Sequence, residues 1–173
     1  GLGVALEFHP GTLTHTAAGA RTVLDGVNHP ALRTHWQPDP ALTAVDALAE
    51  LRVVVDSLAY LHVFAWGPGG MAERYPLADG PELWISALGI AAEAPALPAD
   101  LSSASGSSDG ARPRYCLLEY VADDDPEQLV TDAATLNAWI EEAKKFEGQP
   151  MSEDSRRTLA LLKLMSAMPA PKD

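Results

Sequence analysis

Cysteine and basic residues are scarce in this sequence of 173 residues. Its single cysteine, Cys116, excludes an internal disulfide framework and suits a reducing compartment such as the cytoplasm. Only 12 Lys and Arg stand against 24 Asp and Glu, and the formal net charge of −12 disfavours a nucleic-acid partner because it repels phosphate backbones. The most apolar stretch, 51–65, is interrupted by Arg52, Asp56 and His62, so it falls short of the ~18 apolar residues of a membrane span.

The remaining composition is that of a globular protein. Hydrophobic residues make up 47% of the chain and charged residues 21%, and the length suits one domain. The chain opens at Gly1 without Met, and a strand pattern begins as early as Val4. We therefore expect residues 1–173 to form a single, partial domain whose N-terminal portion is missing.

Apolar runs and helical periodicities alternate along the chain. Short aliphatic and aromatic segments predict four buried strands, at 3–9, 32–37, 58–66 and 115–121. Apolar residues at helical spacing predict a first helix that Thr14 or Thr16 caps and that runs through Val27, and further helices at 40–55, 82–92, 126–146 and 151–168. Such alternation is typical of an α/β fold, with a parallel sheet in chain order and helices on its outer face. The Ser- and Gly-rich segment 95–114 is predicted to be a flexible loop.

One polar residue lies in or at the end of each predicted strand. These residues are Glu7, Gln37, His62 and Glu119. Buried Glu and His are costly unless they are paired, hydrogen-bonded or bound to a metal. Because the carboxyl ends of parallel strands meet at one edge of a sheet, we expect these side chains to converge there. Two carboxylates, an imidazole and an amide oxygen would suit a divalent cation.

The segments that carry these residues resemble a known family. Residues 6–14, 29–38, 60–63 and 116–121 are similar, in order, to strands five to eight of the xylose isomerase-like TIM barrels, the sugar phosphate isomerase/epimerase superfamily. The stretch 74–84, with its Pro-Leu-Ala-Asp-Gly sequence, resembles the segment after the family's seventh strand. The resemblance implies four βα units that form the C-terminal half of a TIM barrel.

The resemblance also implies a function. A divalent metal ion (Mn, Zn, Co or Mg) would be bound by Glu7, Gln37, His62 and Glu119, with Gln37 standing where the family has Asp. Glu7 and Glu119 would remove and return a proton next to the carbonyl of a sugar or sugar phosphate, through an enediolate. The expected substrate contacts come from three further residues: His9, Trp66 and Arg74.

Other interpretations stay open. Gln37, together with Pro40 where the family often has His, would also fit a sugar-binding relative that has lost its metal. An apurinic-type endonuclease shares the barrel but needs a basic face, which the net charge of −12 disfavours. Glu7 could instead form a structural ion pair, and His9 and His35 could simply pack on the sheet. An open four-stranded sheet with two free edges is also expected to associate, for example as a homodimer.

Overall fold

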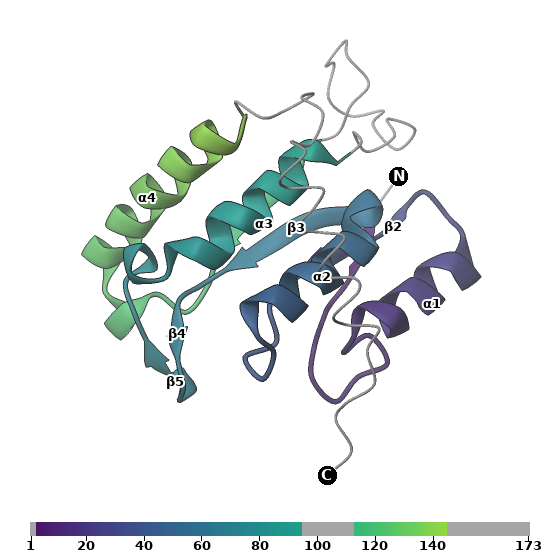
Figure 1. Cartoon of the computed structure of the whole chain (residues 1–173), viewed down its shortest axis with the longest axis horizontal. Coiled ribbons are helices and arrows are strands. Elements are labelled where there is room, and N and C mark those ends of the chain that lie inside the picture. The colour runs from purple at the N-terminus through teal and green to yellow at the C-terminus, as the bar shows by residue number, and fades with distance from the viewer. Residues whose placement is uncertain (1–2, 95–112, 145–173) are drawn as a thin grey trace.

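Four strand–helix units make up the described part of the chain. The computed structural model describes residues 3–94 and 113–144 (Figure 1). The principal strands are β1 (Val4–Leu6), β2 (Leu32–Trp36), β3 (Leu58–Val63) and β6 (Tyr115–Leu118). The helices are α1 (Ala17–Val27), α2 (Ala44–Val54), α3 (Pro81–Glu93) and α4 (Pro126–Lys144).

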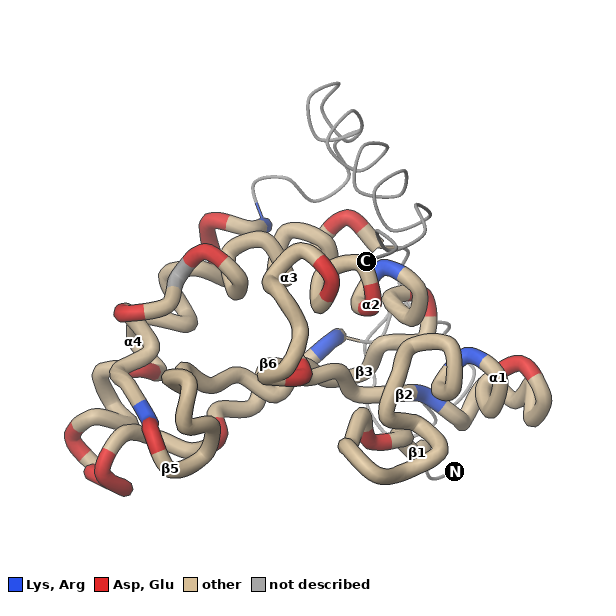
Figure 2. Tube along the Cα trace, turned by 60° about the horizontal axis from the view of Figure 1, so that its bottom comes forward, with Lys and Arg blue, Asp and Glu red and all other residues tan. Residues whose placement is uncertain are grey.

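The strands form a parallel sheet in the order β1-β2-β3-β6. Figure 2 shows the four helices arranged along one side of this sheet. The alternation of strands and helices in the sequence therefore predicted the α/β class, the strand order and the outer helical layer, and the structure confirms all three. None of the helices in the described ranges is long and apolar enough to cross a membrane.

The core lies between the sheet and the helices. Successive side chains of a strand point to opposite faces, and the helix-facing set includes Trp36, Leu61 and Val63, each at most 1% exposed. From the helical layer, Leu51 and Trp84 pack into the same cluster with exposures of 0% and 1%. The indole of Trp84 also donates a hydrogen bond of 2.7 Å to the carbonyl oxygen of Phe64, which satisfies its buried N–H.

The opposite face of the sheet carries a different set of side chains. Tyr115 and Leu117 of β6 are 53% and 43% exposed, and the ring of Tyr115 stacks on that of Tyr60 with 6.0 Å between centroids. His35 and His62 belong to this face too, because each alternates with the core residues Trp36 and Val63. The two histidines thus point away from the helical layer.

Threonine caps decide where two of the helices begin. The hydroxyl of Thr16 accepts a hydrogen bond from the Gly19 N–H at the start of α1, and the hydroxyl of Thr43 accepts one from the Asp46 N–H at the start of α2. The second helix was predicted to begin at Pro40. It begins at Ala44 instead, because Thr43 satisfies the first free amides and leaves residues 40–42 in a turn.

All four strands are shorter than predicted. The first, expected over 3–9, covers only Val4–Leu6, and the second ends at Trp36 rather than at 37. The third strand, expected over 58–66, ends at Val63, and a small antiparallel hairpin of β4 (Trp66–Gly67) and β5 (Gly70–Arg74) follows. Gly70 has φ +63, a left-handed conformation that glycine adopts without strain, so it permits the tight turn. The fourth strand ends at Leu118 rather than at 121. The predicted helix at 151–168 and residues 95–112 of the predicted loop lie outside the described residues.

Candidate functional site

Four polar side chains form a row across the open face of the sheet, one from each strand or its carboxyl end. Glu7 follows β1, His35 belongs to β2, His62 to β3, and Glu119 follows β6. The Nδ1 atom of His62 lies 3.0 Å from Oε1 of Glu119, and Nε2 of His35 lies 3.9 Å from Oε1 of Glu7. The two imidazole rings stack with 4.1 Å between centroids. A continuous line of carboxylate, imidazole, imidazole and carboxylate results.

The register of the sheet brings the two histidines together. Between Thr34 and His35 the pairing of β2 with β3 shifts by one residue, so that Thr34 pairs with Leu58 but His35 pairs with Tyr60. Such an irregularity re-aims the side chains that follow it. The hydroxyl of Thr34 bridges this point by donating to the carbonyl oxygens of Leu6 and His35. The stack of His35 on His62 thus depends on pairing that no local sequence pattern reveals.

Burial holds His35 in its neutral form. Its side chain is 12% exposed, and burial, with the neighbouring His62 adding to it, lowers its pKa from 6.5 to about 4, although Glu7 acts in the opposite direction. The Nε2 atom of His35 and the Nδ1 atom of His62 are buried and have no aligned hydrogen-bond partner. Buried polar atoms in this state are costly. The row therefore has unused hydrogen-bonding and ligand capacity beside its carboxylates.

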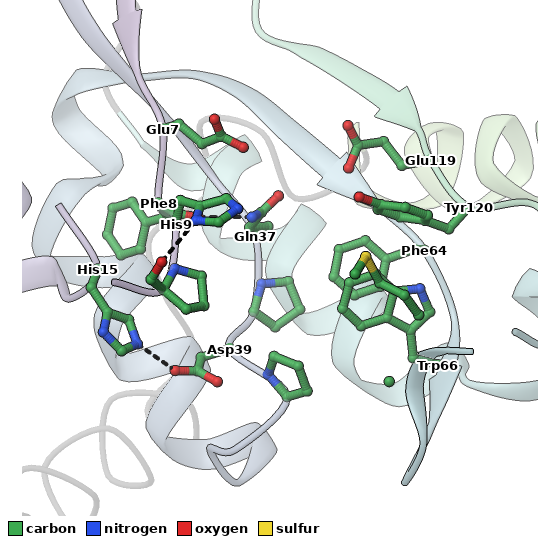
Figure 3. Close-up of a pocket in the computed structure, with 15 residues that line it drawn as sticks. Glu7, Phe8, His9, His15, Gln37, Asp39, Phe64, Trp66, Glu119 and Tyr120 are labelled. Atoms are coloured by element: carbon green, nitrogen blue, oxygen red, sulfur yellow. Dashed lines mark hydrogen bonds and ion pairs between the residues drawn. The ribbon is translucent and has the colours of Figure 1, made fainter. Parts of the chain in front are cut away.

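A pocket with a cavity volume of about 440 Å³ lies at the carboxyl ends of the strands. Its lining includes five of the residues that the sequence predicted for the site: Glu7, His9, Gln37, Trp66 and Glu119. In Figure 3 the carboxylates of Glu7 and Glu119 point toward one another across this pocket, with Gln37 between them. In α/β proteins this end of the sheet is where ligands bind, because side chains from several strands converge there.

Gln37 is fixed by the backbone of the neighbouring strand. Its Nε2 donates a hydrogen bond of 2.7 Å to the carbonyl oxygen of Phe8. This bond leaves the amide oxygen on the side of the two carboxylates (Figure 3). An oxygen atom at that position can act as a weak cation ligand or accept a hydrogen bond from a hydroxyl group.

Aromatic rings form one wall of the pocket. Phe64 stacks on Trp66 with 3.9 Å between centroids, and the ring of Tyr120 meets Trp66 edge-on at 5.0 Å. Tyr120 has φ +52, a left-handed conformation that is strained for a bulky residue and tends to persist where function requires it. The strained residue immediately follows Glu119, so the turn of the chain that ends β6 presents both side chains to the pocket.

Two loops meet at the end of the pocket away from the facing carboxylates. The Nε2 atom of His15, before α1, lies 2.8 Å from Oδ2 of Asp39, before α2. The backbone N–H of Ala41 donates to the other oxygen of Asp39, and these two hydrogen bonds keep the pKa of Asp39 below its ordinary value. His9, one of the predicted substrate contacts, lies near this end and hydrogen-bonds to the carbonyl oxygen of Pro10. The sequence analysis did not identify His15 or Asp39 as site residues.

Arg74, the third predicted substrate contact, is engaged elsewhere. Its Nη1 lies 2.5 Å from Oδ1 of Asp124, and its Nε donates to the carbonyl oxygen of Met71. The guanidinium lies 5.5 Å from the centre of the Tyr120 ring. Arg74 does not line the pocket itself; it braces the ring of Tyr120, which does.

The side chains fit a divalent cation in kind. Carboxylates, an amide oxygen and an imidazole nitrogen are suitable donors, and the unpartnered Nδ1 of His62 beside Glu119 is a nitrogen that a metal ion would satisfy. The distances between these candidate ligands fit a bound cation less well than their chemistry does. Within residues 3–94 and 113–144, no three His, Cys, Asp or Glu side chains gather closely enough to hold a metal ion. The predicted convergence thus brings His62 next to Glu119, whereas Glu7 faces them from across the pocket.

No protein-family model and no curated protein sequence matches this chain. The resemblance to the xylose isomerase-like barrels therefore stays a prediction, and the function has to be argued from the pocket itself.

Proposed function

We propose that the chain is a sugar or sugar-phosphate isomerase or epimerase that moves a proton at a carbon next to a carbonyl group. The observation that carries this proposal is the pair of carboxylates, Glu7 and Glu119, that face one another across the pocket (Figure 3). Two carboxylates on opposite sides of a bound carbon atom can remove a proton from one face and return it to either face. Proton transfer by a positioned carboxylate contributes typically 10²- to 10⁴-fold to a rate.

The other pocket residues have roles that suit such a substrate. The stacked rings of Phe64 and Trp66 offer an apolar wall for the C–H face of a sugar. Gln37, held by the carbonyl oxygen of Phe8, presents an amide oxygen to a substrate hydroxyl. His62 holds Glu119 in place through its contact of 3.0 Å. These residues bind and orient the substrate, and the facing carboxylates move the proton.

A divalent metal ion belongs to this proposal. His62 and Glu119, which lie in contact, would provide its first ligands, and Glu7 and Gln37 would have to approach it from across the pocket. When bound, the ion would stabilise negative charge on the substrate oxygens as the proton leaves. The contact of 3.0 Å between Nδ1 of His62 and Oε1 of Glu119, an imidazole nitrogen beside a carboxylate oxygen, is the feature that supports this assignment.

Solvent-isotope exchange tests the proposal directly. The purified chain is incubated in D₂O with a panel of ketoses, aldoses and their phosphates, with Mg²⁺ or Mn²⁺ added, and deuterium at the carbon next to the carbonyl is measured by mass spectrometry. We expect incorporation with at least one sugar. Glu7→Gln and Glu119→Gln should each reduce its rate by about a hundredfold or more. Asp25→Asn, which changes a carboxylate of α1 paired with Arg21 outside the pocket, serves as the matched control.

A second candidate is a sugar-binding protein without chemistry. Gln37 supports it, since an amide fixed to the carbonyl oxygen of Phe8 is a weaker cation ligand than a carboxylate. The same experiment separates the two functions. Sugar binding with no deuterium incorporation in the presence of metal would contradict the isomerase and favour the binding protein.

A further inference from the structure

Negative charge dominates the lining of the pocket. Its fifteen described lining residues include the carboxylates of Glu7, Asp39 and Glu119, and none of the fifteen is Lys or Arg. Proteins bind phosphate groups mainly with Arg and Lys side chains or with the free amides of helix N-termini. A phosphate in this pocket would meet three like charges and no Lys or Arg side chain from its described lining. The two imidazoles of that lining are already engaged, His9 with the carbonyl oxygen of Pro10 and His15 with Asp39.

Three amides at the nearby helix N-termini are already hydrogen-bonded. At the start of α1 the N–H of Ala17 donates to Oε1 of Glu50, and the N–H of Gly19 donates to Thr16. At the start of α2 the hydroxyl of Thr43 accepts from the helix. These two helices follow the loops that line the pocket, and their ends carry a carboxylate or a hydroxyl where a phosphate would otherwise bind.

Arg74 is also withheld from the pocket. Its guanidinium is bound to Asp124 and to the carbonyl oxygen of Met71, and it lies over the outer ring of the aromatic wall, Tyr120. Releasing it toward a substrate phosphate would break an ion pair of 2.5 Å and remove the contact that braces this ring. The arginine therefore supports the wall of the pocket and does not serve an anion.

The far end of the pocket offers a hydrogen-bond acceptor. Asp39, fixed by the N–H of Ala41, accepts a hydrogen bond from Nε2 of His15. Nδ1 is the other polar atom of the same ring, and it can pair with the O–H of a sugar hydroxyl. Figure 3 shows this pair at the end of the pocket away from Glu7 and Glu119. The carboxylate of Asp39 beside this ring disfavours a phosphate oxygen at that place, whereas a sugar hydroxyl carries no charge to repel.

We infer that the pocket takes an uncharged sugar rather than a sugar phosphate, and that the His15–Asp39 pair binds a hydroxyl group at the end of the substrate remote from the reacting carbon. This inference rests on the proposed function and narrows it to a substrate class. The juxtaposition that carries it is three carboxylates and a fixed imidazole around one pocket whose described lining has no Lys or Arg.

Paired ligands test the inference. Free ketoses and aldoses and the terminal phosphates of the same sugars are titrated into the purified full chain in the presence of a chelator, so that the carboxylates carry their full charge, and binding is followed by ligand-observed NMR. We expect each phosphate to bind at least about tenfold more weakly than its parent sugar, because of the like charges in the pocket. Equal or tighter binding of the phosphates would overturn the inference and leave the proposed function standing. If neither class binds, the proposed function fails, and the inference fails with it.

Two variants locate the selectivity. Asp39→Asn keeps a hydrogen-bonding group beside His15 but removes a negative charge. It should therefore lower, by a few-fold, the ratio of the Kd of the sugar phosphate to the Kd of the free sugar. His15→Phe removes the acceptor and should weaken binding of the free sugar by about fivefold. Asp25→Asn on α1 makes the same change of net charge outside the pocket, and it should alter neither the Kd of the free sugar nor the ratio of the two Kd values. If Asp39→Asn and Asp25→Asn behave alike, the pair at the far end does not select the substrate.

Discussion

Acid should destabilise the metal-free protein through His35. The side chain is 12% exposed and its pKa is lowered from 6.5 to about 4, so between these values the unfolded chain binds a proton that the folded chain does not. Stability then rises with pH across this window, and the contribution lost on acidification is complete only below the folded pKa. With these two values the free energy of unfolding falls by at most about 2 kcal/mol from this residue between pH 7 and pH 5.

The comparison that isolates this effect uses His35→Gln, which cannot titrate. Urea unfolding followed by circular dichroism at pH 7, 6 and 5, with chelator present, should give a steeper loss of stability for the wild type than for the variant. The same change at the exposed His29 should leave the wild-type pH dependence in place, because that imidazole is not buried. Parallel curves for the wild type and His35→Gln would refute the burial argument and would require another partner for the Nε2 atom of His35.

Three further predictions concern packing and reactivity. Leu61→Ala should lower the free energy of unfolding by about 2–5 kcal/mol in chemical denaturation, because this side chain is 1% exposed between the sheet and the helices; a loss below 1 kcal/mol would mean that the site collapses around the smaller residue. Asp132→Ala should cost about 1–3 kcal/mol by the same assay, since its carboxylate is buried and accepts the N–H of Leu77 at 2.9 Å, which would be left unpaired. Cys116 should react with iodoacetamide at pH 8 about a hundredfold more slowly in the folded than in the unfolded protein, because burial raises its pKa from 9.0 to about 11; equal rates would show that β6 opens readily.

The sequence predicts the sheet better than the ends of its strands. Four apolar runs separated by helical periodicity can pack in few ways, so the order of the strands and the side on which the helices lie were predictable. The aromatic run through Trp66 looks like a continuation of the third strand, because composition alone does not show where hydrogen bonding to a neighbour stops. The glycines and proline of 67–70 are the signal for the hairpin, and they indicate that the strand has to end before them.

Some residues of the candidate site could likewise be predicted from the sequence, and others could not. Glu7, Gln37 and Glu119 could be predicted, because a polar residue at the carboxyl end of a parallel strand has one edge of the sheet to occupy. The stack of His35 on His62 could not, since it depends on a one-residue shift in register between two strands.

Contacts between loops could not be predicted from the sequence either. His15 and Asp39 are 24 residues apart, and Arg74 and Asp124 are 50 apart. Their pairing depends on how loops fold over the sheet edge, and no periodicity encodes that. For Arg74 this matters directly, because the sequence suggested a substrate contact and the structure gives it an ion pair with Asp124.

Because one tryptophan lies in the aromatic wall of the pocket, the protein's intrinsic fluorescence should report ligand binding. Trp36 and Trp84 are sealed in the core at 0% and 1% exposure, so their fluorescence should hardly respond to a ligand. Trp66 differs, since it lines the pocket and stacks on Phe64. A molecule that enters the pocket would change the polarity around that indole, and the difference in emission between the wild type and Trp66→Phe would then report occupancy without any label. Candidate ligands could be screened by light alone, before any reaction is known.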